Sequence, residues 1–267
     1  MTASPIRLYY YRHRSGQSNF GDALSPLIIE RVIGRPTVWA HQAACDVAAI
    51  GSILGSIVQR RWKRWLHMRF DPVHVWGSGF IRPYRDGPNP LLKCHAVRGH
   101  ISRLALGLPE DTALGDPGLL AGRLIVPPAD KRHGWAIVPH LSDLRLPVVK
   151  ALHERNPHSV IADLSDDPLD ILRTIAASEF VVSTSLHGLV IADALGIPSI
   201  WATFSGKVSG DRFKFEDYYS ALGIPAPVRL DIQAPLDFGP LEALAQVAPK
   251  AAVNHCCQRL TEAFPGL

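Results

Sequence analysis

Residues 180–198 read Phe-Val-Val-Ser-Thr-Ser-Leu-His-Gly-Leu-Val-Ile-Ala-Asp-Ala-Leu-Gly-Ile-Pro, and this stretch decides the fold class. A short β-branched run ends in three hydroxyl residues and is followed by an apolar segment, which Gly196 and Pro198 close. Another β-rich run follows at residues 199–201. A strand, a helix and a strand in this order predict parallel strands joined by a crossover helix, which is the unit of an α/β fold.

The same alternation continues in both directions along the chain of 267 residues. Expected strands lie at residues 6–11, 47–50, 73–76, 95–97, 135–139 and 159–162, and expected helices at 23–33, 54–61, 100–106, 147–155 and 168–177. Residues 125–134 are rich in proline and charge, which predicts a boundary between two lobes. We therefore expect two Rossmann-like lobes facing a cleft, at residues 1–130 and 131–267. The mostly helical tail at 241–264 can pack back on the first lobe.

The composition is that of a well-buried globular protein, with 47% hydrophobic and 19% charged residues. A net charge of +4 favours an anionic small molecule or an acidic membrane surface, and no nucleic-acid motif is present. The four cysteines have neither zinc-site spacing nor the density of a disulfide scaffold, so we expect reduced thiols in the cytoplasm. We expect no signal peptide, because the first residues read as a strand at 6–11. We expect no transmembrane helix, because the longest apolar run, residues 47–58, is too short to cross the hydrocarbon core of a bilayer.

The first candidate site lies where the expected strand after Phe180 passes into a helix. Free amides and a partial positive charge at a helix N-terminus favour a phosphate or a carboxylate. Ser183, Ser185 and the imidazole of His187 can add hydrogen-bond donors in a first turn that also contains Gly188. Alternatively, the serines only cap the helix and the histidine packs in the core. These residues alone leave both interpretations open.

A second candidate site joins the first expected strand to the first expected helix. The carboxyl edge of a parallel sheet commonly binds ligand, and this segment offers cations and small polar groups. The residues concerned are Arg12, Arg14, Ser18 and Asn19. Asp22, at the end of the segment, is either a helix cap or a general base for a sugar hydroxyl.

Arg98 ends another expected strand and is a candidate anion ligand. Its planar guanidinium suits two oxygens of a phosphate or carboxylate, whereas the alternative is an ion pair between the lobes. Ser78 and Gly79 belong to a small-residue turn that lets backbone approach a ligand. Residues 115–118 form a similar turn, and each turn alone is a weak signal.

Two segments combine charges with aromatic residues. Residues 211–219 contain Arg212 and Lys214 among carboxylates and aromatic rings, a mixture that suits a sugar site but also covers hydrophobic edges. Residues 60–69 interleave cations with two tryptophans. That segment either binds the surface of an anionic membrane or forms the solvent-exposed basic face of a helix.

Together, and in order, these segments resemble the polysaccharide pyruvyl transferase family, in particular the enzymes that pyruvylate xanthan and succinoglycan repeats. The matching segments are residues 8–12, 19–22, 76–79, 96–99, 115–120, 138–140, 185–188 and 211–219. The resemblance implies two lobes of the GT-B kind, phosphoenolpyruvate as donor, and no nucleotide, cofactor or essential metal. It also implies that Arg98 and His187 hold the donor, and it adds His140 to the candidate binding residues.

The resemblance further implies transfer of pyruvate to a terminal hexose of a lipid-linked exopolysaccharide repeat unit, forming a cyclic ketal. We expect His187 to protonate C3 of the donor and Asp22 to deprotonate a sugar hydroxyl. Contact of residues 60–69 with the inner membrane face remains one of the two interpretations of that segment. One alternative is a nucleotide-sugar glycosyltransferase, although the acidic residue that would bind a ribose has no match in register. Another is a non-catalytic sugar-binding subunit, against which the presence of Arg98, His187 and Asp22 argues.

Overall fold

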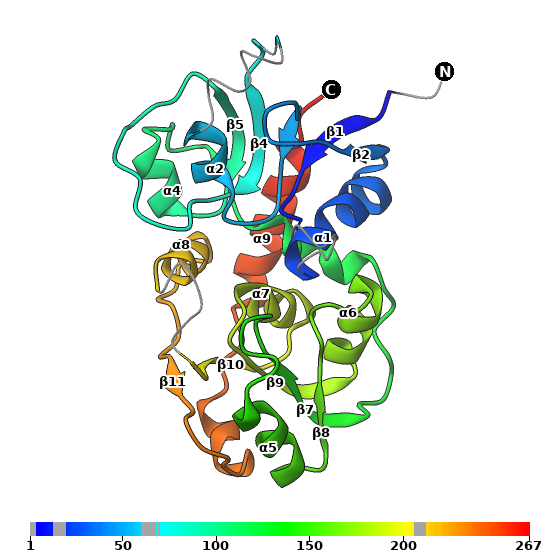
Figure 1. Ribbon diagram of the computed structural model, residues 1–267. Helices are drawn as coiled ribbons and strands as arrows, with labels where there is room; N and C mark the ends of the chain where they lie inside the picture. The colour runs from blue at the N-terminus through cyan, green and yellow to red at the C-terminus, as the bar shows by residue number, and fades with distance from the viewer. Residues whose placement is uncertain (1–3, 13–19, 60–67, 69, 206–211) are drawn as a thin grey trace.

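The computed structural model describes residues 4–12, 20–59, 68, 70–205 and 212–267. Within these ranges the strands form two sheets, in the orders β2-β1-β3-β4-β5-β6 and β11-β10-β9-β7-β8, with every neighbouring pair parallel. Figure 1 shows one sheet above the other, each with helices around it. The α/β prediction and the two parallel sheets of Rossmann-like lobes are therefore confirmed.

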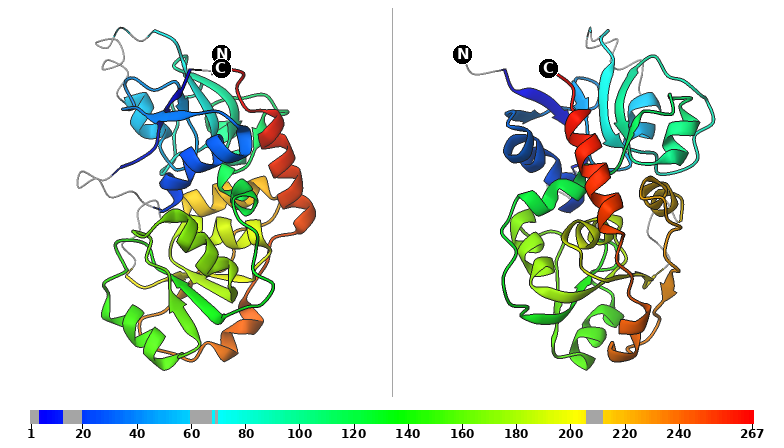
Figure 2. Two further views of the ribbon diagram at one scale, coloured as in Figure 1. Left: turned by 90° about the vertical axis from the view of Figure 1, so that its right-hand side faces the viewer. Right: turned by 180° about the vertical axis from the view of Figure 1, so that it is seen from behind.

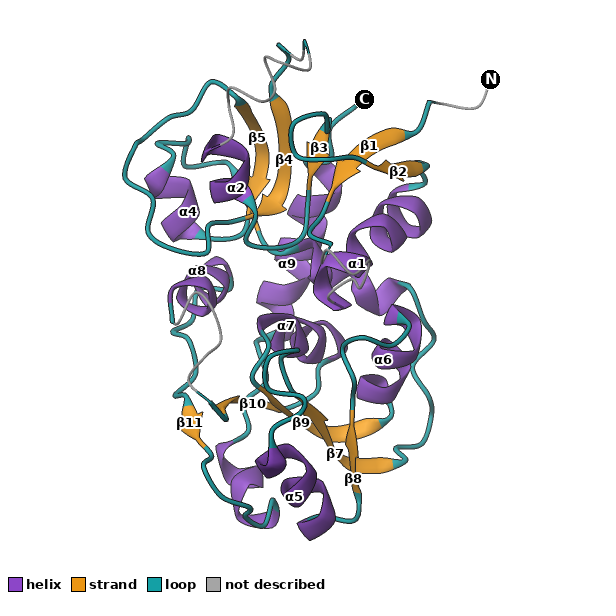
Figure 3. Ribbon diagram, viewed as in Figure 1, coloured by secondary structure: helices purple, strands orange, loops and turns teal. Residues whose placement is uncertain are grey.

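The first sheet and its helices come from the first part of the chain. The strands are β1 (Ile6–Tyr9), β2 (Thr37–Trp39), β3 (Val47–Ala48), β4 (Val73–Ser78), β5 (Leu92–Val97) and β6 (Ala113–Leu114), and the helices are α1 (Phe20–Ile28), its π-helical extension η1 (Ile29–Ile33), α2 (Leu54–Gln59), α4 (His100–Ala105) and the 3₁₀-helix η2 (Pro117–Arg123). Figure 3 shows β4 and β5 ending toward the second lobe. The loops that follow these strands therefore face the space between the lobes.

The second sheet takes the strands from β7 onward. These are β7 (His133–Val138), β8 (Ser159–Ile161), β9 (Ser178–Ser183), β10 (Ser199–Thr203) and β11 (Leu230–Asp231), with helices α5 (Pro147–Arg155), α6 (Pro168–Ala176), α7 (Leu186–Leu195), α8 (Phe213–Ala221), η3 (Gly239–Leu244) and α9 (Lys250–Glu262). Helix α6 begins as the sequence predicts, because the Asp167 side chain accepts a hydrogen bond from the Leu169 amide at 2.9 Å and Pro168 fits the first turn.

Helix α7 is the element around which the two lobes meet. Every residue from Leu186 to Asp193 is buried, because one side of the helix contacts β9 and β10 while others contact α1, α6 and η2. A helix that is apolar on all sides is stable only in such surroundings. Gly196 ends it in the left-handed conformation, at φ 67°. The start of α7 is thereby fixed at the junction of the lobes.

Helix α9 runs along the outside of both lobes, as Figure 2 shows. Its Leu260 is fully buried in the core that contains Trp76 of β4, and the Trp76 indole donates a hydrogen bond to the Leu260 carbonyl at 2.8 Å. The C-terminal helix therefore packs on the first lobe. Among the described residues, none of the helices combines the length and apolar character that crossing a bilayer requires.

Candidate active site

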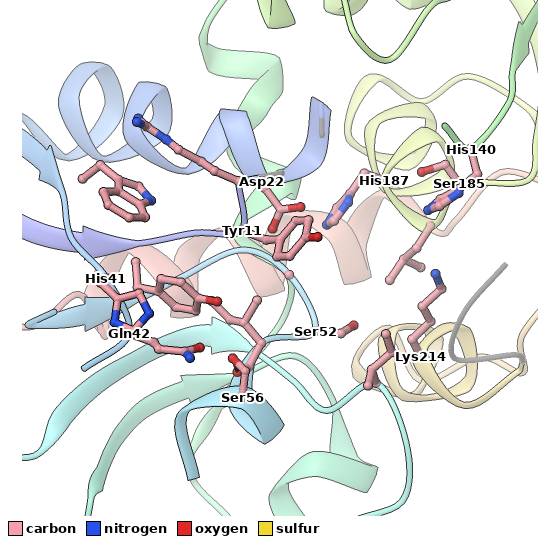
Figure 4. Close-up of a pocket in the computed structure, with 17 residues that line it drawn as sticks. Tyr11, Asp22, His41, Gln42, Ser52, Ser56, His140, Ser185, His187 and Lys214 are labelled. Carbon is pink, nitrogen blue, oxygen red and sulfur yellow. Dashed lines mark hydrogen bonds between the residues drawn. The ribbon is translucent and has the colours of Figure 1, made fainter. Parts of the chain in front are cut away.

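A cavity of about 820 Å³ lies between the lobes and is lined by both of them. The lining residues from the first lobe are Tyr9, Tyr11, Arg12, Asp22, Trp39, His41, Gln42, Gly51, Ser52, Ile53, Ser56 and Ile81, and those from the second are His140, Ser185, Leu186, His187 and Lys214. Figure 4 shows Asp22, His187 and Lys214 around the same space. Many of these residues follow strands at the carboxyl ends of the two sheets, where ligands of parallel sheets bind.

The first turns of α1 and α7 meet at the cavity. The His187 ring lies so close over Gly21 that a Cβ atom at residue 21 would stand 1.8 Å from the ring Nδ1. A Cβ atom at Gly51, which follows β3, would stand 2.8 Å from Asp22 Oδ1. Glycine at these two positions therefore lets Asp22 and His187 approach from different lobes, although 165 residues separate them.

The serines before α7 have different roles. Ser183 is fully buried, and its hydroxyl donates to the Val138 carbonyl at 2.9 Å and accepts from the Ser185 amide at 3.0 Å. A Cβ atom at Gly188 would stand 2.2 Å from the Ser183 hydroxyl oxygen, so these two residues build the turn away from the cavity. Ser185 lines the cavity, and its side chain makes no capping hydrogen bond.

Arg98 lies in an ion pair between the lobes rather than on the cavity surface. Its guanidinium is fully buried, and Nε and Nη2 each lie 3.0 Å from Asp217 Oδ2 of α8. Nη2 also donates to the Phe80 carbonyl at 2.6 Å, and Nη1 donates to the Ser52 hydroxyl. These contacts are those of the ion pair between the lobes, the alternative that the sequence left open, and Arg98 is not among the residues that line the cavity. Arg98 instead connects α8 to Ser52, which does line the cavity.

The small-residue turn after β4 supports Arg98. A Cβ atom at Gly79 would stand 2.6 Å from the Arg98 Cζ, so the guanidinium lies flat against this backbone. The Ser78 hydroxyl donates to the Gly51 carbonyl at 2.7 Å and is fully buried. Both residues therefore shape the loops around the cavity without lining it.

Lys214 of α8 is the second-lobe cation at the cavity. Burial, and then repulsion by Arg98, lower its pKa to about 8, while attraction by Asp22 acts in the opposite direction. Burial also lowers the pKa of His140 to about 4, with a further contribution from Lys214, so this imidazole is neutral near pH 7. Arg212 does not line the cavity and pairs with Glu216 at 3.0 Å.

Arg12 is the first-lobe cation at the cavity. Its guanidinium lies 4.8 Å from the ring centre of Tyr10 and 5.2 Å from that of Trp39, which fixes the side chain between two aromatic faces. Arg14, Ser18 and Asn19 lie outside the described residues, as does most of the basic segment 60–69.

Asp116 is a buried carboxylate beside the site that the sequence indicated only as part of a turn. Its Oδ1 accepts from the Gly118 amide at 2.8 Å, and its Oδ2 lies 3.7 Å from His187 Nε2. The signals in the sequence were the small-residue turn at residues 115–118 and the resemblance of residues 115–120 to the family, and neither gave Asp116 a role. In the described part of the chain, no group of three or more His, Cys, Asp or Glu side chains is arranged to hold a metal ion.

Comparison with known proteins identifies the family. Residues 2–205 match the family model described as polysaccharide pyruvyl transferase. The chain belongs to the polysaccharide pyruvyl transferase family. This membership confirms the resemblance drawn from the sequence segments and makes the protein an enzyme of that family. The match ends before α8, so Lys214 and Asp217 lie beyond it.

Two curated relatives align with this pyruvyl transferase. The chain is 33% identical to the uncharacterized protein L143 of Acanthamoeba polyphaga mimivirus, over 77% of this chain and 71% of that protein. It is 27% identical to the succinoglycan biosynthesis protein ExoV of Rhizobium meliloti (strain 1021), over 82% of this chain. The alignment spans 66% of ExoV, just under two thirds of its length.

Proposed function

We propose that the protein transfers pyruvate from phosphoenolpyruvate to two hydroxyls of a hexose in a polysaccharide repeat unit, forming a cyclic ketal and releasing phosphate. The observation that carries this proposal is the meeting of Asp22, His187 and Lys214 around one cavity between the lobes. Family membership supports pyruvyl transfer to a polysaccharide. The relation to a protein named for succinoglycan biosynthesis supports an exopolysaccharide acceptor.

The cavity has the charges that an anionic donor needs. Phosphoenolpyruvate carries a phosphate and a carboxylate, and two cations line the space, Lys214 from the second lobe and Arg12 from the first. The free amides at the start of α7 add a partial positive charge. These groups can stabilise the phosphate as it leaves. The donor needs no cofactor in this scheme.

Asp22 and His187 are suited to move the protons of the reaction. We assign protonation of the donor C3 to His187, after which C2 accepts the first sugar oxygen, and removal of that hydroxyl's proton to Asp22. The bond between C2 and the phosphate oxygen then breaks, and the second sugar oxygen closes the ketal. One hydroxyl proton replaces the proton delivered to C3, and the other leaves with the phosphate.

The acceptor is assigned to the first-lobe side of the cavity. Trp39 and Tyr11 line this side with 39% and 49% of their surfaces exposed, and flat aromatic faces suit a hexose ring. Donor on the second lobe and acceptor on the first correspond to a GT-B arrangement, with lobes at residues 1–130 and 131–267. We further propose a lipid-linked acceptor, a cytoplasmic location and contact of residues 60–69 with the inner membrane face.

Calorimetric titration with phosphoenolpyruvate, and in parallel with a panel of nucleotide sugars, tests the donor. The proposal predicts saturable binding of phosphoenolpyruvate that is lost in the His187→Ala variant. Binding of a nucleotide sugar with no binding of phosphoenolpyruvate would instead identify a glycosyltransferase.

A further inference from the structure

Asp116 has one carboxylate oxygen without a hydrogen-bond partner among the described residues. The side chain is fully buried at the start of η2, directly after β6. Its Oδ1 is used, because it accepts from the Gly118 amide at 2.8 Å. Its Oδ2 is buried and has no such bond within the described part of the chain. A buried carboxylate oxygen without a hydrogen bond lowers the stability of the folded protein, because its lost hydration is not replaced. We therefore expect a functional partner for this oxygen.

The nearest partner for this oxygen is Nε2 of the His187 ring. His187 Nε2 is buried without a hydrogen bond among the described residues and lies 3.7 Å from Asp116 Oδ2. The opposite edge of the ring, with Nδ1, lies against Gly21 of α1, and the His187 side chain, unlike Asp116, is among those that line the cavity. Asp116 therefore stands behind the imidazole, on the side away from the ligand.

We propose that Asp116 is a positioning residue that accepts a hydrogen bond from His187 Nε2–H and so presents Nδ1 to the donor. The inference rests on the proposed function, in which His187 delivers the proton to C3. The distance of 3.7 Å exceeds a hydrogen bond, and catalytic hydrogen bonds often tighten when the ligand binds. A carboxylate in this place holds the Nε2 proton and stabilises the charged ring, whose other proton, on Nδ1, is the one delivered to C3.

The Asp116→Asn variant tests this inference because it retains size and shape. An asparagine oxygen can still accept from Gly118, but its amide then points N–H groups at His187 Nε2. The ring then carries a single proton, on Nδ1, and a neutral imidazole is a far weaker acid toward C3 than the charged ring. The same exchange behind the histidine of a serine protease lowers kcat by about 10⁴-fold through the wrong tautomer. We expect kcat to fall at least about 100-fold here, with phosphoenolpyruvate affinity within about 2-fold of wild type.

The ring nitrogens are read directly by nitrogen-15 NMR of histidine-labelled protein, with the His187→Gln spectrum assigning the signals. With phosphoenolpyruvate bound, the expected result is a proton on both ring nitrogens in the wild type and on Nδ1 alone in Asp116→Asn. The matched control is Asp193→Asn, a buried carboxylate on α7 that bonds to Tyr218 at 2.9 Å and the Ala248 amide. This control should alter thermal stability but leave the His187 proton and kcat unchanged.

A wild-type ring without a proton on Nε2, both free and with phosphoenolpyruvate bound, would overturn the inference. So would unchanged ring signals and kcat in Asp116→Asn, because Asp116 would then only cap η2. The wild-type spectrum decides the question even if the variant does not fold. Absence of pyruvyl transfer by the wild-type protein would reject the proposed function while leaving the tautomer result interpretable.

Discussion

Replacing Gly21 by alanine tests whether the starts of α1 and α7 form one site. The added Cβ would stand 1.8, 2.1 and 2.4 Å from three atoms of the His187 ring. Because non-bonded heavy atoms sit roughly 3.5 Å apart, the ring must move by about 1.7 Å. A displacement of about 1 Å can cost about 100-fold in rate, so kcat should fall at least that much.

The cost to folding should be smaller than the cost to activity. Overpacking costs about 1–3 kcal/mol, and the gain of up to about 1 kcal/mol from replacing glycine inside a helix offsets part of it. The net loss is therefore about 0–2 kcal/mol. Gly55→Ala in α2 is the matched control, because its Cβ would meet nothing within 4 Å.

The two effects are measured by phosphate release from phosphoenolpyruvate in the presence of acceptor and by urea unfolding of each variant. Gly55→Ala should retain full activity and gain slightly in stability. A Gly21→Ala protein with near wild-type activity would refute the reasoning, because His187 could not then act from its place against this backbone.

Four further results are expected. Phosphoenolpyruvate affinity measured by calorimetry should fall as pH rises from 7 to 9, because Lys214, with a pKa of about 8, loses its charge, and Lys214→Met should abolish this dependence. Arg98→Ala should lower the free energy of unfolding by about 3–5 kcal/mol in urea, since it leaves Asp217 buried without its cation, and a loss below about 1 kcal/mol would contradict the buried pair. Leu260→Ala should cost about 2–5 kcal/mol through the cavity it leaves under α9, and unchanged stability would show that this helix does not brace the first lobe. Trp39→Ala should raise KM for the acceptor while leaving donor affinity unchanged, whereas the reverse pattern would move the acceptor elsewhere.

The sequence predicted those helices and strands that are long enough to show an apolar pattern with clear start and stop residues. The strand before α7, the helix itself and its glycine stop all follow from a continuous apolar run with clear ends. Strands β2 and β6 were not predicted, because three and two residues are too few to show a period. The expected strand at 6–11 ends at Tyr9, where the chain turns toward the cavity.

The sequence predicted which segments contribute residues to the candidate site, but not which side chains contact one another there. His187, Asp22 and Lys214 were singled out and do line one cavity. The family resemblance placed Arg98 at the ligand. The residues around Arg98 in the sequence do not reveal that its guanidinium pairs with Asp217, which lies 119 residues later. Asp116 was seen only in a turn, because its relation to His187 depends on how the lobes meet. Contacts of this kind depend on tertiary packing and leave no periodic signal in the sequence.

Transfer of the pyruvyl carbon tests the central claim most directly. Purified protein is incubated with phosphoenolpyruvate labelled with carbon-13 at C2 and with oligosaccharide from chemically depyruvylated succinoglycan, without a nucleotide sugar. The account predicts that the label appears as a ketal carbon on a hexose, with one phosphate released for each ketal formed and none in His187→Ala. Phosphate release without sugar labelling, or sugar transfer only from an added nucleotide sugar, would contradict it.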